Sequence, residues 1–238
     1  MYKEQVYWDS RYQEEQEDTG GHEWFGSYSD FSCLVRKELR PGSSGLVLGC
    51  GTSSLSVDLH AEGVSPVVSI DYSPVCIAEM AQRHAGRAGM SWLVMDAREL
   101  QFPDGSFDLV IEKGTLDAMM VDEKDPWSVS PQTITLVDQV LSEVSRVLSP
   151  DGIFISVTFS QPHFRGRHYA QPQYGWSVSC NTYGVDFHYF LYTMRKGEEL
   201  SPRDRESGRS LHEPHVQPEL LPTLSDSDNE DFLTNICV

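Results

Sequence analysis

An apolar strand, a glycine turn and the start of a helix follow one another in Leu46-Val47-Leu48-Gly49-Cys50-Gly51-Thr52-Ser53-Ser54. Glycine has no Cβ, so the backbone of such a turn can approach a ligand closely. The helix that follows offers free N–H groups and the positive end of its dipole. The run therefore predicts either a tight structural turn or a nucleotide-type site at the carboxyl edge of a parallel sheet.

Acidic residues follow the next three predicted strands, which span residues 67–70, 92–95 and 107–111. Asp71 lies about 20 residues after the glycine turn, where a carboxylate can reach both hydroxyls of a ribose. A surface carboxylate that caps the next helix is the alternative for this residue. Asp96 suits a hydrogen bond to an adenine amino group, and Glu112 opens a further polar stretch. These strand ends therefore predict one line of ligand-binding groups along the sheet.

This series resembles the class I S-adenosylmethionine-dependent methyltransferases. A dinucleotide-binding dehydrogenase would carry a third glycine where this chain has Ser54. Two further motifs are similar to those of the lysine methyltransferases of translation elongation factor 1-alpha: Tyr7-Trp8-Asp9-Ser10-Arg11-Tyr12 and Glu112-Lys113-Gly114-Thr115-Leu116-Asp117-Ala118. The resemblance extends from about residue 7 to residue 197. The chain departs from the wider class at Val47, where many members carry an acidic residue, and at Ser53, which replaces a frequent glycine.

The resemblance implies a Rossmann-like α/β domain over residues 1–197. Its sheet would be mostly parallel and twisted, with helices on both faces and a C-terminal antiparallel hairpin. The cofactor would be S-adenosyl-L-methionine, with S-adenosyl-L-homocysteine as product. The implied cofactor-binding residues are Trp8, Tyr12, Gly49, Cys50, Gly51, Asp71, Tyr72, Asp96, Ala97 and Lys113. From periodicity and composition alone, the aromatic members of this set could equally be packing residues.

A lysine of elongation factor 1-alpha is the acceptor that the resemblance implies. A carboxylate near the reacting methyl group would hold the lysine nitrogen, and Glu112 and Asp117 are the candidate catalytic residues. Asp117 could instead cap or position a helix. A small-molecule methyltransferase and a cofactor-binding scaffold without catalysis stay open as alternatives. The chain lacks an Asn/Asp-Pro-Pro-Tyr run at the end of its fourth strand, which argues against methylation of adenine or of a glutamine amide.

The composition is strongly acidic, with 18 Lys+Arg against 36 Asp+Glu and a formal net charge of −18 over 238 residues. Phosphates would be repelled, so nucleic acid is not expected as a direct partner, whereas a basic protein would be attracted. Solubility alone is the alternative explanation. Five cysteines without a Cys-x-x-Cys pair, and histidines without metal-ligand spacing, indicate reduced thiols and no metal site. We expect a cytoplasmic monomer without signal peptide or membrane span.

The remaining elements are predicted from hydrophobic periodicity. Residues 5–16 form a helix on which Val6, Trp8 and Tyr12 share a face, and it can lie over a cofactor as a lid. Residues 162–176 are basic and aromatic, and we expect a loop there that borders the acceptor site, with Arg165 to Trp176 framing its entrance. A basic loop that only neutralises nearby acidic surface is the alternative. Further helices are expected at residues 28–39, 74–87 and 130–148, a strand at 153–159, and a hairpin at 176–181 and 187–194.

Beyond residue 197 the composition changes to Ser, Pro, Glu and Asp with few aromatic residues. Such a segment has too little apolar surface to offset the entropy of ordering it. Residues 198–238 are therefore predicted to be an acidic, disordered tail. Residues 226–233 combine acidic and apolar side chains, which is typical either of a short interaction motif or of a solvated tail.

Overall fold

The structure is a computed structural model that describes residues 4–15 and 21–212. Seven strands of this described part form one sheet, in the order β3-β2-β1-β4-β5-β7-β6. Neighbours from β3 to β5 are parallel, while β7 is antiparallel to both β5 and β6. The strand bounds are β1 Gly45–Leu48, β2 Val67–Asp71, β3 Met90–Val94, β4 Phe107–Lys113, β5 Leu148–Thr158, β6 Trp176–Tyr183 and β7 Tyr189–Lys196.

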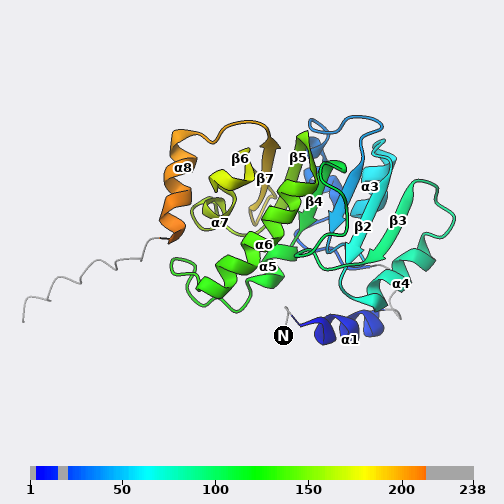
Figure 1. Cartoon of the computed structure of the whole chain (residues 1–238). Coiled ribbons are helices and arrows are strands. Elements are labelled where there is room, and N and C mark those ends of the chain that lie inside the picture. Colours follow the sequence, from blue (N-terminus) through cyan, green and yellow to red (C-terminus); the bar gives the residue numbers. More distant parts are fainter. Residues whose placement is uncertain (1–3, 16–20, 213–238) are drawn as a thin grey trace, which may run out of the picture.

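Helices cover both faces of this sheet. In Figure 1, α6 crosses the front of the sheet, and α1 lies beside α4 at one edge. Proline at the first helical position, after a serine cap, starts α4, α6 and α8. The helix bounds are α1 Gln5–Glu15, α2 Tyr28–Val35, α3 Leu55–Ala61, α4 Pro74–Arg83, α5 Thr115–Met119, α6 Pro131–Val147, α7 Pro162–Tyr169 and α8 Pro202–Arg209, with 3-10 turns at Pro172–Tyr174 and Ser210–His212.

Alternate residues of the central strands supply two separate cores. Val47 and Ile111 pack with helices α1 to α4 on one face. Leu46 and Val110 pack with α6 and α7 on the other. In α6 the predicted apolar stripe is buried, from Val137 through Leu141 to Val147. Strands that are buried on both faces read as continuous apolar runs, which explains the sequence of β1.

The structure confirms the Rossmann-like α/β fold and the C-terminal antiparallel hairpin. The polar ends of β1, β2 and β4 meet at one edge because these neighbouring strands run in the same direction. In α1 the prediction for Val6 was wrong, since its side chain is 76% exposed. Trp8 and Tyr12 are four residues apart and share the buried face of this helix, which Val6 does not join.

The predicted loop at residues 162–176 is instead a helix, α7, followed by a 3-10 turn. Pro162 occupies its first turn, where a missing N–H costs nothing. Arg165 and Trp176 are buried rather than placed at an entrance. Arg167 is also buried, and its guanidinium donates to the backbone oxygens of Pro126 and Trp127. Arg165 and Arg167 therefore join α7 to α5 and to the segment at residues 126–127.

The structure also departs from the expected tail over residues 198–212. Helix α8 packs against α7 through Gly208, where a Cβ would collide with the carbonyl oxygen of Ala170. The amide of Gln171 donates to the Gly208 carbonyl at 2.9 Å, and Leu211 is buried. The composition did not indicate this helix because the contacts of Gly208 and Leu211, and not an apolar stripe, attach it to the domain. Residues 213–238, which include the 226–233 motif, lie outside the described residues.

Candidate active site

The glycine turn after β1 is locked against the end of β4. Gly49 has φ 58° and Gly51 has φ 50°, a conformation that favours glycine. A Cβ at Gly49 would collide with the Thr115 side chain, whose hydroxyl donates to the Leu48 carbonyl at 2.9 Å. The backbone here is thus open to a ligand on one side and tied to the start of α5 on the other.

Asp71 ends β2 directly beside this turn. Its Oδ2 accepts the Gly51 N–H at 3.1 Å, and its Oδ1 accepts the Ser73 N–H at 3.0 Å. The side chain lines the cavity although the residue is only 5% exposed. Burial raises the pKa of Asp71 to about 6, against the opposing effect of these N–H donors. Hydroxyl donors from a ligand would favour the charged form of this carboxylate.

Helix α1 closes one side of the cavity. The Ser73 hydroxyl donates to the Asp9 carboxylate at 2.5 Å, which ties α1 to the first turn of α4. Trp8 and Tyr12 stack with ring centroids 5.6 Å apart, and both line the cavity. The guanidinium carbon of Arg11 lies 5.6 Å from the centroid of the Trp8 ring. The position of α1 therefore agrees with the predicted lid.

Residues 21–26 run along the cavity and are fixed at its glycine turn. Glu23 accepts from the Ser53 hydroxyl at 2.8 Å and from the Ser54 N–H at 2.7 Å. Lys113 donates to Glu23 at 2.8 Å and to the Trp24 carbonyl at 2.7 Å. The ammonium group of Lys113 thus holds this segment in place, a function that was not predicted from its position in the sequence.

The ends of β2 and β3 border the opposite part of the cavity. Tyr72 follows Asp71, and Asp96 with Ala97 follows β3. Partial burial raises the pKa of Asp96, but Arg98, which donates to it at 2.5 Å, holds that pKa below its usual value. Asp96 is therefore an ionised acceptor at the cavity wall.

These groups surround one cavity of about 530 Å³. A volume in the range of roughly 300–1,000 Å³ suits a ligand of cofactor size. All of the predicted cofactor-binding residues line it: Trp8, Tyr12, Gly49, Cys50, Gly51, Asp71, Tyr72, Asp96, Ala97 and Lys113. Sequence reasoning missed other lining residues, namely Arg11, His22, Trp24, Phe25, Thr115 and Phe159. Arg11 and Thr115 lie inside the two motifs that carry the family resemblance, so their place in these motifs could have indicated them as site residues.

The two candidate catalytic carboxylates differ in their surroundings. Asp117 lines the cavity. Glu112 does not, because its side chain is fully buried behind the start of α5. Its carboxylate accepts the Thr115 and Leu116 N–H groups at 2.9 and 3.3 Å and the hydroxyl of Ser156. Glu112 therefore caps α5 and joins it to β5, and the expectation that it faces an acceptor nitrogen does not fit this structure.

One cluster in the described part of the chain brings metal-ligand atoms together. The thiols of Cys50 and Cys76 and a carboxylate oxygen of Asp71 lie within 4.8 Å of one another. A hydrogen bond with Cys50, together with burial, raises the pKa of the Cys76 thiol above its usual value. Both oxygens of Asp71 accept backbone N–H groups, so in this structure the cluster is a pair of thiols packed beside a hydrogen-bonded carboxylate.

Comparison with known proteins gives the family. A family model described as a methyltransferase domain matches residues 40–196. Two relatives called EEF1A lysine methyltransferase 4 are 49% identical over 236 residues in Mus musculus and 50% identical over 235 residues in Bos taurus. Each match covers 99% of this chain and 92% of the relative. This chain belongs to the EEF1A lysine methyltransferase 4 family. The family match confirms the resemblance that the two sequence motifs indicated.

Solved structures share the fold of this methyltransferase at lower identity. The N-methyltransferase NodS from Bradyrhizobium japonicum, in complex with S-adenosyl-L-homocysteine, has a TM-score of 0.60 at 17% identity, over 80% of this chain and 99% of NodS. The 1,6-didemethyltoxoflavin-N1-methyltransferase from Burkholderia thailandensis has a TM-score of 0.56 at 16% identity, over 82% of this chain and 87% of that enzyme. In residues 4–15 and 21–212 the methyltransferase has no helix that combines the length and apolar character of a membrane span.

Proposed function

We propose that this chain is an S-adenosylmethionine-dependent protein-lysine N-methyltransferase that acts on a lysine of EEF1A. The proposal rests on one observation above all: ten residues predicted to bind the cofactor, together with Asp117, line a single cavity in a chain of this family. The names of the relatives supply the acceptor, since the mouse and cattle proteins are called EEF1A lysine methyltransferases.

The residues of the cavity suit the chemistry of S-adenosylmethionine. The buried carboxylate of Asp71 would accept from the two ribose hydroxyls, which replaces the solvation that burial removes. Asp96 and Ala97 would hold the adenine edge, with the Tyr72 ring packed beside it. Gly49 and Gly51 line the cavity, and their backbone would lie beside the amino-acid end of the cofactor.

Arg11 completes this assignment at the amino-acid end. A carboxylate needs a cationic partner in a partly enclosed site. Lys113, which was predicted for the cofactor, is engaged by Glu23 at 2.8 Å and holds residues 21–26. Arg11 lines the cavity, and its guanidinium carbon lies 5.6 Å from the centroid of the Trp8 ring and 5.1 Å from that of the Trp24 ring. We therefore assign the cofactor carboxylate to Arg11.

Catalysis in this site consists mainly of placing the reactants and excluding water. When bound, the cofactor supplies an activated methyl group and its leaving group together. Trp8 and Tyr12 would cover it from the side of α1, and Asp117 would hold the acceptor nitrogen. The lysine ammonium first releases a proton to solvent, and the neutral amine then takes the methyl group while S-adenosylhomocysteine leaves. The site holds the two reactants in line. The entropy cost of bringing separate molecules together, which is a large part of the barrier, is therefore met when they bind.

The acidity of the chain favours a basic protein partner. A net charge of −18 steers positively charged surfaces toward the enzyme, and this attraction is screened over about 8–10 Å at physiological salt. We also propose that the enzyme is a cytoplasmic monomer without a direct nucleic-acid partner.

Transfer of a labelled methyl group tests this proposal. The purified enzyme is incubated with S-adenosylmethionine labelled on the methyl carbon, together with purified EEF1A, and separately with the small-molecule fraction of a cell extract. We expect label in the EEF1A band and none in the small-molecule fraction. Label only among small molecules would support a small-molecule methyltransferase instead. Cofactor binding without any transfer would support a scaffold.

A further inference from the structure

Phe25 has a strained backbone beside the cavity. Among the described residues other than glycine, it is the one with a left-handed φ, at 59°. Such strain persists only where the surroundings impose it, and it is common at ligand sites. The Tyr183 hydroxyl donates to the Phe25 carbonyl at 2.6 Å and holds this conformation. The Phe25 ring thereby lines the cavity, and it also contacts Phe159 and Tyr189 at centroid distances of 5.7 and 5.5 Å.

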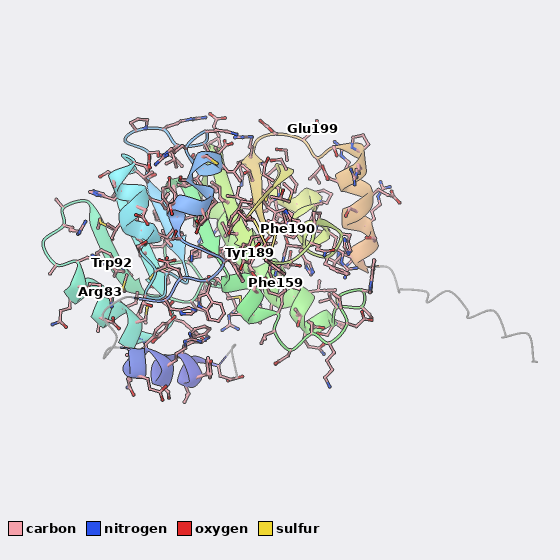
Figure 2. All side chains as sticks on the ribbon, turned by 180° about the vertical axis from the view of Figure 1, so that it is seen from behind. Arg83, Trp92, Phe159, Tyr189, Phe190 and Glu199 are labelled. Carbon is pink, nitrogen blue, oxygen red and sulfur yellow. The ribbon has the colours of Figure 1, made fainter. Side chains whose placement is uncertain are left out.

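Phe159 is exposed at the same place. Its side chain lines the cavity, and the residue is 51% exposed although it directly follows the buried strand β5. Figure 2 shows Phe159 next to Tyr189, where β5 ends and β7 begins. The rings of Phe25 and Phe159 meet at an interplanar angle of 62°. Two aromatic rings from distant parts of the sequence thus bound one part of the cavity.

Asp117 lies at the inner side of this aromatic pair. Its Oδ1 accepts from the hydroxyl of Thr158, the neighbour of Phe159, at 2.6 Å and from Arg165 at 2.9 Å. A Cβ placed on Gly114, three residues before Asp117, would lie 3.2 Å from the Phe25 ring. Asp117 is 6% exposed, and within the described part of the chain its Oδ2 has no hydrogen-bond partner.

The buried charges at this end of the cavity do not balance. Asp117 pairs with the guanidinium of Arg165, which is 3% exposed, and the charge of this guanidinium also acts on Glu112. When both carboxylates are ionised, the three groups carry one excess negative charge, which attracts a further cation. Burial raises the pKa of Glu112 to about 7, and the negative charge of Asp117 contributes to this rise. Near neutral pH a proton on Glu112 thus neutralises part of the excess negative charge, which a cationic ligand could neutralise instead.

We propose that Phe25 and Phe159 form the walls of a subsite for the acceptor's lysine side chain, with Asp117 as its anionic inner end. This subsite deepens the proposed function and rests on it for the identity of the acceptor. Aromatic faces attract an ammonium group and contact its alkyl chain, while the Asp117 carboxylate orients the nitrogen toward the cofactor. Thr158 and Arg165 fix the carboxylate in place.

Steady-state kinetics on EEF1A, with S-adenosylmethionine saturating, test the aromatic walls. Phe159→Ala should raise KM for EEF1A by about two- to fivefold, the usual effect of an exposed cation–π contact, with S-adenosylhomocysteine affinity unchanged. Phe187→Ala is the matched control, since Phe187 is 57% exposed but does not line the cavity. An unchanged KM in Phe159→Ala, or an equal rise in Phe187→Ala, would overturn the subsite.

A second measurement does not depend on EEF1A as acceptor. Binding of n-butylamine, which carries the alkyl ammonium group of lysine, is followed by ligand-observed NMR on the full chain saturated with S-adenosylhomocysteine. We expect binding to the wild type and to Phe187→Ala, and a loss of at least about tenfold in Asp117→Asn because a charge-assisted hydrogen bond is removed. Butylamine binding that persists in folded Asp117→Asn would refute the subsite. If butylamine binds as expected but EEF1A is not methylated, only the proposed acceptor is wrong.

Discussion

The backbone N–H of Gly51 donates to Oδ2 of Asp71 at 3.1 Å, so the glycine turn and the carboxylate at the end of β2 form one unit. Asp71→Ala removes the acceptor that we assign to both ribose hydroxyls. Because each charge-assisted hydrogen bond contributes about 1.5–3 kcal/mol, affinity for S-adenosylhomocysteine should fall at least about tenfold. Isothermal titration calorimetry measures this change.

Asp108→Ala is the matched control for that loss of charge. Asp108 accepts a backbone N–H, that of Ser44 at 2.9 Å, but it does not line the cavity. Its replacement should leave the affinity for S-adenosylhomocysteine as it is. Full affinity in a folded Asp71→Ala protein would refute the ribose assignment, and equally strong binding of NADH would support a dehydrogenase instead.

The pH dependence of cofactor binding should follow the carboxyl group of Asp71. Burial raises its pKa to about 6, and the ribose hydroxyls donate to the ionised form. Ligand binding must therefore displace a proton at lower pH. Affinity for S-adenosylhomocysteine should be constant above about pH 7 and fall by up to about tenfold per unit below about pH 6. The α-carboxyl group of the ligand titrates below this fall in affinity, with a pKa of about 3.3–3.7, and its α-amino group titrates above it, at about 7.7–8.0 or higher. Calorimetry between pH 5 and 8 with Asp71→Asn as reference checks this, and a flat wild-type profile would contradict it.

Arg11→Gln should distinguish the two ends of the cofactor. We assign the guanidinium of Arg11, which lies beside the rings of Trp8 and Trp24, to the carboxylate at the amino-acid end of the cofactor. Affinity for S-adenosylhomocysteine should fall about tenfold, whereas 5′-methylthioadenosine, which lacks that carboxylate, should bind as before. Competitive displacement of a fluorescent adenosine analogue measures both. Equal weakening of the two ligands would show that Arg11 acts only by supporting α1.

Residues 201–212 should contribute to stability. A chain that ends at Leu200 loses α8, with the contact of Gly208 to Ala170 and the buried side chain of Leu211. Its melting temperature should be several degrees lower than that of a chain ending at His212, since a loss of about 1 kcal/mol lowers Tm by about 2–4 °C in a domain of this size. Differential scanning calorimetry of the two truncated chains and the full chain makes the comparison. Identical melting temperatures of the two truncated chains would restore the earlier expectation of a tail that begins near residue 198.

The glycine turn and the strand-end acids could be predicted because local chemistry determines them. The turn needs glycine for its backbone angles, and a carboxyl end of a parallel strand places Asp71 at the cavity regardless of packing details. In contrast, Glu112 and Asp117 look alike in sequence, since one lies in the last two residues of β4 and the other only four residues beyond its end. Their difference comes from the short helix α5, which turns one carboxylate into its own cap and the other toward the cavity.

Long-range contacts account for what the sequence did not reveal. The ion pair of Glu23 with Lys113 joins residues 90 positions apart, and the contact of Phe25 with Phe159 joins rings still farther apart. Neither pair has a periodic pattern that would indicate it. The basic residues of α7 were interpreted as a surface feature, although Arg167 is buried and its guanidinium donates to the backbone carbonyls of Pro126 and Trp127. Single-sequence patterns report faces of helices and strands, not which faces meet.

Lysine-resolved mass spectrometry of EEF1A tests the central claim most directly. Purified EEF1A is incubated with S-adenosylmethionine and either wild-type enzyme or Asp71→Ala, then digested and sequenced by tandem mass spectrometry. We predict added methyl groups on lysine with the wild type, none with Asp71→Ala, and fewer with Asp117→Ala. Methyl groups on another residue type, or equal methylation by wild type and Asp71→Ala, would contradict lysine transfer from this cavity.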